Sequence, residues 1–79
     1  MEGSAAMKLR DLKKVYHGEI MLTVLAYFKN TKEYYSFRSY GGEPIKFESV
    51  GEEEMEMEVI RIDIDCKKDV MWVDVIEWI

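Results

Sequence analysis

The sequence contains one cysteine, one proline and one histidine, and no apolar run approaches the ~18 residues of a membrane-spanning helix. The single cysteine, Cys66, excludes an internal disulfide framework and is typical of a protein in a reducing compartment. Neither a transmembrane helix nor a basic-then-apolar signal pattern is predicted. We therefore expect a cytoplasmic protein.

Residues that bind soft metals or phosphate groups are also scarce. His17 and Cys66 are the only soft metal ligands in the sequence, and two ligands cannot complete a zinc site. The pair Gly41-Gly42 lacks the strand–helix context and the lysine of a phosphate-binding loop. The sequence therefore predicts no cofactor and no metal.

One short motif leaves an enzymatic alternative open. Asp65-Cys66-Lys67 is similar to the acidic-x-Lys element of metal-dependent nucleases, and Asp63 is expected on the same strand face as Asp65. Such a site needs a further acidic ligand, which Asp74 on the following strand would have to supply. A solvated strand face followed by a polar hairpin is the favoured interpretation. We therefore predict that the protein is not an enzyme.

The composition is that of a folded protein. Hydrophobic residues make up 48% and charged residues 34% of the chain, which is typical of a globular domain and not of a disordered tail. A chain of this length buries only about 60% of the surface that its unfolded form exposes. We predict a single α+β domain over residues 7–79. Residues 1–6, small and without periodicity ahead of Met7, are expected to be a leader or a cloning remnant.

The hydrophobic periodicity predicts one helix and four main strands. Apolar residues at helical spacing predict a short helix over residues 8–17. Alternating or β-branched segments predict strands over residues 19–28, 33–40, 55–65 and 70–79. For residues 45–50, a short edge strand and a loose turn both fit. The predicted fold is one short N-terminal helix packed on a four- to five-stranded, mostly antiparallel sheet.

The same periodicity predicts which side chains are buried. The expected core consists of the apolar residues on one face of each element, namely Leu9, Leu12, Leu22, Val24, Ile60, Ile62, Ile64, Trp72 and Ile76. The last strand is apolar on both faces, and its second face carries Met71, Val73, Val75 and Ile79. An uncovered second apolar face favours a homodimer formed through this strand.

Charge is distributed unevenly along the chain. Residues 1–40 carry seven Lys/Arg against four Asp/Glu, a net of +3, whereas residues 41–79 carry four against twelve, a net of −8. The acidic residues that would face a basic protein partner are Glu52, Glu53, Glu54, Glu56, Glu58, Asp63 and Asp65. A solvated loop that enters a strand is the simpler interpretation of this run. Charge of this kind indicates partners and solubility and does not indicate a reaction.

An aromatic–arginine segment is the other candidate interaction surface. Tyr34, Tyr35, Phe37, Arg38 and Tyr40 follow one another closely, as in strands that stack nucleic-acid bases. The net charge of −5 is opposite to that of most nucleic-acid readers. Core and interface packing is therefore the favoured interpretation, and direct nucleic-acid binding is not expected.

Both ends of the chain resemble a known group of proteins. The segments that carry the resemblance are Leu9-Arg10-Asp11-Leu12-Lys13-Lys14-Val15, Glu58-Val59-Ile60-Arg61-Ile62-Asp63-Ile64 and Asp69-Val70-Met71-Trp72-Val73-Asp74-Val75. They are similar to the LRDLLKV-like N-terminal helix and the two acidic C-terminal strands of small uncharacterised proteins from phages and prophages of low-GC Gram-positive bacteria. The likeness covers about a third of the chain, and residues 34–51 depart from the pattern. It implies an accessory role in the host cytoplasm and carries over no catalytic residue.

These observations together predict a non-enzymatic phage-type accessory protein that binds another macromolecule. The more specific expectation is an acidic protein that inhibits a nucleic-acid-binding machine of host defence. Anti-CRISPR proteins are inhibitors of this kind. The alternative is a structural or oligomerising domain with no inhibitory role, and a nuclease-like enzyme is the third.

Overall fold

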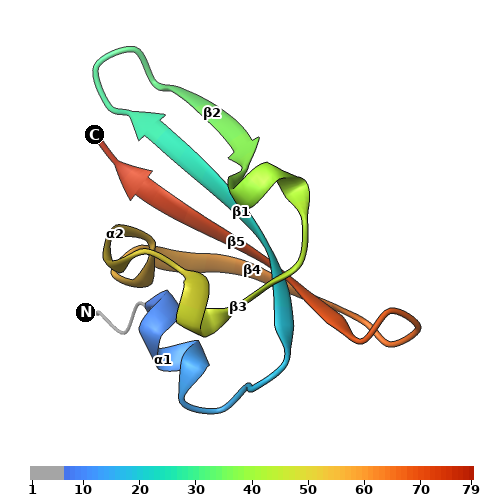
Figure 1. Ribbon diagram of the computed structural model, residues 1–79. Helices are drawn as coiled ribbons and strands as arrows, with labels where there is room; N and C mark the ends of the chain where they lie inside the picture. Colours follow the sequence, from blue (N-terminus) through green and yellow to red (C-terminus); the bar gives the residue numbers. More distant parts are fainter. Residues whose placement is uncertain (1–6) are drawn as a thin grey trace.

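The computed structural model describes residues 7–79, and the segment expected to be a leader lies outside the described residues (Figure 1). The elements follow in the order α1 (Leu9–Lys13), β1 (Glu19–Phe28), β2 (Glu33–Arg38), a 3-10 turn η1 (Ser39–Gly42), β3 (Ile45–Lys46), a second 3-10 turn η2 (Phe47–Ser49), α2 (Glu52–Met55), β4 (Glu58–Asp65) and β5 (Val70–Trp78). No helix within this range is long and apolar enough to cross a membrane.

The strands form one five-stranded sheet in the order β2-β1-β5-β4, with β3 paired to β1. The β1–β2, β1–β3 and β4–β5 pairs are antiparallel, and the central β1–β5 pair is parallel. The predicted α+β class, with a short helix and a mostly antiparallel sheet, is therefore confirmed. Strand β1 is central, as expected for a strand with two apolar faces.

The strand predicted over residues 33–40 ends at Arg38, because the backbone turns left-handed there. Tyr40, Gly41 and Gly42 have φ values of 56°, 69° and 74°, a region that a residue with a side chain rarely adopts. Hydrogen bonds hold Tyr40 in place: its hydroxyl accepts from the Gly51 N–H at 2.7 Å and donates to the Glu54 carboxylate at 3.0 Å. The ambiguous segment after this turn forms the two-residue strand β3 and then η2.

The core lies between one face of the sheet and the short helices. Its buried residues are Leu9, Leu12, Ile20, Leu22, Val24, Phe47, Met55, Met71, Val73 and Val75. Met71, Val73 and Val75 were expected on the face that self-associates, so that assignment is wrong: α1, η2 and α2 cover this face. Ile76 is buried on the opposite face as predicted, and Trp72 there is half-buried.

The three isoleucines of β4 are not core residues, contrary to the prediction. Ile60, Ile62 and Ile64 are 45%, 40% and 63% exposed. Strand β4 lies at the edge of the sheet, and the short helices cover mainly the central strands β1 and β5. A register shift between Val59 and Arg61 also bends β4 at Ile60.

One helix is shorter than predicted and the other was not predicted. Helix α1 is five residues long, and Val15, placed on its apolar face by periodicity, is 76% exposed. So short a helix depends on packing, which Leu9 and Leu12 supply. The glutamate run forms the helix α2 where a solvated loop entering a strand was expected, and β4 begins at Glu58 in place of the predicted residue 55.

Candidate partner-binding groove

The helix α2 brings the glutamate run to the end of the sheet where β4 begins and β5 ends (Figure 1). Glu52, Glu53 and Glu54 occupy its first turn, where negative charge is favourable, and Met55 is buried in the core. The helix therefore has one buried anchor, and the carboxylates of Glu52 and Glu53 are left exposed.

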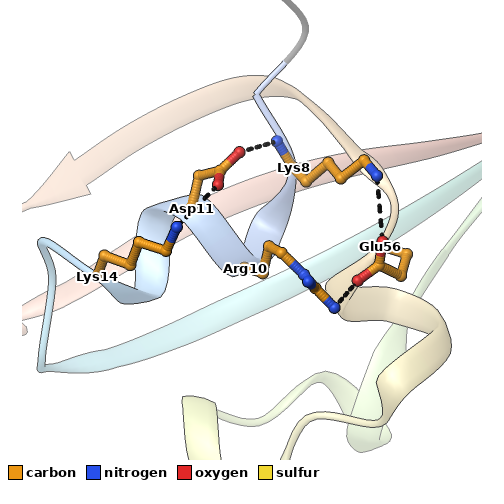
Figure 2. Close-up of polar contacts among 5 residues, drawn as sticks. All are labelled: Lys8, Arg10, Asp11, Lys14 and Glu56. Atoms are coloured by element: carbon orange, nitrogen blue, oxygen red, sulfur yellow. Dashed lines mark hydrogen bonds and ion pairs between the residues drawn. The ribbon is translucent and has the colours of Figure 1, made fainter.

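Glu56 joins α2 to α1 through two ion pairs, as Figure 2 shows. Its carboxylate lies 3.1 Å from the Lys8 ammonium and also pairs with the Arg10 guanidinium. On α1, the Asp11 carboxylate accepts the Lys8 backbone N–H at 3.1 Å and lies 3.7 Å from the Lys14 ammonium (Figure 2). Two cations thus compensate Glu56, and its first role is to hold the two helices together.

A groove of about 760 Å³ opens between α2, the start of β4 and the end of β5. Its lining combines five glutamates with three apolar side chains, and consists of Lys8, Glu52, Glu53, Glu56, Met57, Glu58, Ile76, Glu77 and Trp78. Volumes of about 300–1,000 Å³ are typical of binding pockets. The groove therefore has room for the side chains of a bound segment.

The lining of the groove includes an exposed tryptophan. Trp78 is 52% exposed, and its ring packs edge-on against Tyr27 with the centroids 5.3 Å apart. Its indole N–H donates to the Glu58 carboxylate over a long 3.4 Å. Exposed aromatic residues are enriched in the energetically dominant parts of protein interfaces. Trp78 is thus the largest apolar side chain in the lining of the groove.

The charge of the groove is strongly negative. Five carboxylates line it and Lys8 is the single cation in the lining. Among residues 7–79, no ion pair involves Glu52, Glu53, Glu58 or Glu77. Uncompensated carboxylates beside apolar side chains concentrate negative potential. The groove therefore favours a cationic ligand.

Four of the seven predicted partner-binding residues, Glu52, Glu53, Glu56 and Glu58, meet in this groove. Glu54 instead turns to the Tyr40 hydroxyl and is half-buried. Asp63 and Asp65 lie toward the other end of β4. The acidic residues do not form the single surface that their closeness in sequence suggested.

The nuclease-like motif has a structural role at Asp65. Its carboxylate accepts the backbone N–H groups of Lys67 and Lys68 at 3.1 and 3.2 Å and so stabilises the β4–β5 turn. Asp63 lies 4.0 Å from the Arg61 guanidinium, and Arg61 stands opposite Asp74 in the sheet. Within the described part of the chain, no three His, Cys, Asp or Glu side chains are grouped to hold a metal ion.

Glu77 and Trp78 belong to the groove, but sequence reasoning missed them. The register of the β4–β5 hairpin could have indicated them. If Asp65 stands opposite Val70 and the pairing is followed away from the turn, Glu58 comes to stand opposite Glu77. The register shift near Ile60 moves Glu58 to a position opposite Ile76, which leaves Glu77 in the same lining.

Comparisons of the chain with protein-family models, with curated proteins and with solved structures find no match. The groove and its charge are therefore the features from which a function can be inferred.

Proposed function

We propose that this protein is a non-enzymatic binding protein that engages a basic segment of a protein partner in the acidic groove. The observation that carries the proposal is the combination of uncompensated carboxylates with an exposed Trp78 in one concave site. An acidic surface that serves only solubility does not need apolar side chains in the same site.

The geometry of the groove supports a ligand with both charge and apolar surface. Lysine or arginine side chains of the partner would approach Glu52, Glu53 and Glu77. An apolar side chain or an arginine guanidinium would lie on the Trp78 ring, where cation–π attraction adds to burial. Such an arrangement combines electrostatic steering with a central aromatic contact.

We further propose that the protein is a phage-type accessory protein that acts in the host cytoplasm. The support is the resemblance of its two ends to small phage and prophage proteins, together with its acidic second half. Proteins that anti-CRISPR proteins inhibit hold nucleic acid with basic residues. A groove lined with carboxylates would compete with the nucleic acid for those basic residues. Inhibition would then follow from occupying those residues.

A comparison of three baits in host extract tests the proposal. The wild-type protein, a Glu52→Lys/Glu53→Lys variant and a Glu33→Lys/Glu43→Lys control are immobilised and incubated with cytoplasm of a low-GC Gram-positive bacterium. The control reverses two exposed glutamates outside the groove and raises the net charge equally. We expect a basic nucleic-acid-binding protein to be retained by the wild type and the control, and to be lost from the groove variant.

Two further measurements test the same proposal. Retention should weaken steeply with salt, because exposed charges are screened within about 10 Å at 0.1 M. Trp78→Ala should also abolish retention, whereas Tyr34→Ala, at an aromatic 65% exposed on β2, should not. If the groove variant binds as the wild type does, the proposal is wrong and the structural or oligomerising role becomes the better explanation.

A further inference from the structure

The outer edge of β4 has backbone partners only at its beginning. On one side β4 pairs with β5 from Glu58 to Asp65. On the other side, within residues 7–79, the Leu9 N–H donates to the Met57 carbonyl at 3.0 Å and the Val59 N–H donates to the Met7 carbonyl at 2.7 Å. No described strand pairs with the outer edge from residue 60 to residue 65.

This edge is also apolar on one face. Ile62 and Ile64 are 40% and 63% exposed and share a face, since they stand opposite Val73 and Met71, while Ile60 at the register shift is 45% exposed. An exposed strand edge with apolar side chains is a template for pairing with another chain. Natural edges are usually protected by charge, and here the charges of Arg61 and Asp63 have opposite signs.

We propose that the β4 edge pairs with the β4 edge of a second copy, antiparallel and centred on Ile62. In that register, which uses the regular part of β4 after the shift at Ile60, Ile62 stands opposite Ile62 of the second copy. Arg61 then stands opposite Asp63 of the second copy, and the two-fold axis repeats this pair. Opposite charges directly across an antiparallel pair are stabilising, and a two-fold interface uses each contact twice.

Neighbouring registers do not have this complementarity. A centre on Arg61 places the two copies of Arg61 against each other, and a centre on Asp63 does the same with two aspartates. A shift by one residue places isoleucines opposite charged side chains and reverses their faces. The sequence of the edge therefore selects one two-fold register.

The other edge of the sheet does not offer such a register. Strand β2 also has exposed apolar side chains, at Tyr34, Tyr35 and Phe37. Its two charged residues, Glu33 and Arg38, lie on opposite faces of the strand, so no two-fold antiparallel register sets them against each other. Arg38 is moreover placed over the Trp72 ring, 4.7 Å from its centroid.

Charge exchange across the edge tests the pairing. Sedimentation of the full chain at micromolar to submillimolar concentration should show a monomer–dimer equilibrium. Arg61→Asp and Asp63→Arg should each raise the dissociation constant roughly tenfold or more, because each places like charges opposite one another twice. The double variant Arg61→Asp/Asp63→Arg restores both opposite-charge pairs and should return the constant close to that of the wild type. Lys68→Asp, an equal charge change in the exposed turn, is the control.

A cysteine at the two-fold axis tests the register independently. In a Cys66→Ser background, Ile62→Cys places two thiols directly opposite each other, within the Cα separation of about 4.4–6.8 Å that a disulfide requires. Mild oxidation should then give a covalent dimer. Ile64→Cys in the same background should remain monomeric, since residue 64 of the second copy lies several residues away along the second strand. A chain that stays monomeric throughout, a dimer indifferent to Arg61→Asp, or cross-linking at residue 64 in place of 62 would overturn the proposal.

Discussion

Phe47 is predicted to be the residue whose truncation damages the fold most clearly. It is 3% exposed, lies in the segment that crosses from β2 to β4, and packs edge-on against Tyr16 with the ring centroids 6.3 Å apart. A buried Phe→Ala change costs about 3–5 kcal/mol. A chain of this length has a total stability of roughly 4–12 kcal/mol. Phe47→Ala should therefore remove about a quarter or more of the stability and, where the total stability is near the lower limit, unfold the protein.

Urea unfolding followed by the fluorescence of Trp72 and Trp78 measures this loss, which should lower the midpoint by roughly 2–4 M. Phe37→Ala is the matched control, because Phe37 is the same residue type on β2 but is 57% exposed. It should cost about 1 kcal/mol or less. Equal losses for the two variants, or a loss below about 1 kcal/mol for Phe47→Ala, would mean that the crossing segment does not cover the sheet.

Three smaller effects follow from the same structure. Ile62→Ala should cost about 1 kcal/mol at low protein concentration, short of the 2–5 kcal/mol of a fully buried site, because Ile62 is 40% exposed. Glu56→Gln should cost about 1 kcal/mol or less in thermal or urea unfolding, and the difference from wild type should shrink at high salt. Burial raises the pKa of the Tyr16 and Tyr40 hydroxyls above the usual 10.0. The folded state holds these protons more tightly than the unfolded state, so the contribution of these two hydroxyls to stability should be constant below pH 10 and fall as pH rises above it. Urea midpoints measured up to about pH 11 should show this fall, and Tyr40→Phe should reduce it.

The sequence was sufficient to predict the four longer strands, because each of them has a strong local pattern, whereas the two-residue strand β3 was left open. The predicted bounds of β1 agree with the structure at both ends, and β5 differs by one residue. The helical turns at Tyr40 and in α2 were missed, since a left-handed turn and a four-residue helix leave almost no periodicity to detect.

Which face of each strand is covered could not be read from alternation alone. Ile60, Ile62 and Ile64 alternate as a core strand does, yet they are exposed, because the hydrogen bonds that join the start of α1 to β4 lie at the beginning of that strand, at Met57 and Val59. The groove was predicted only in part for a related reason. Its glutamates from α2 and β4 are close in sequence, whereas Glu77 and Trp78 arrive from β5 through tertiary structure.

The parallel pairing of β1 with β5 also constrains the order in which this chain can fold. Glu19 pairs with Val70 and Tyr27 with Trp78, so the two central strands come from distant parts of the sequence. Each hairpin can form early from local contacts, but the sheet has no centre until β5 has been synthesised and docked against β1. Contacts between residues so far apart slow folding. The exposed β4 edge and the apolar face of β1 would remain open during that interval, which is when association with the wrong chain is most probable.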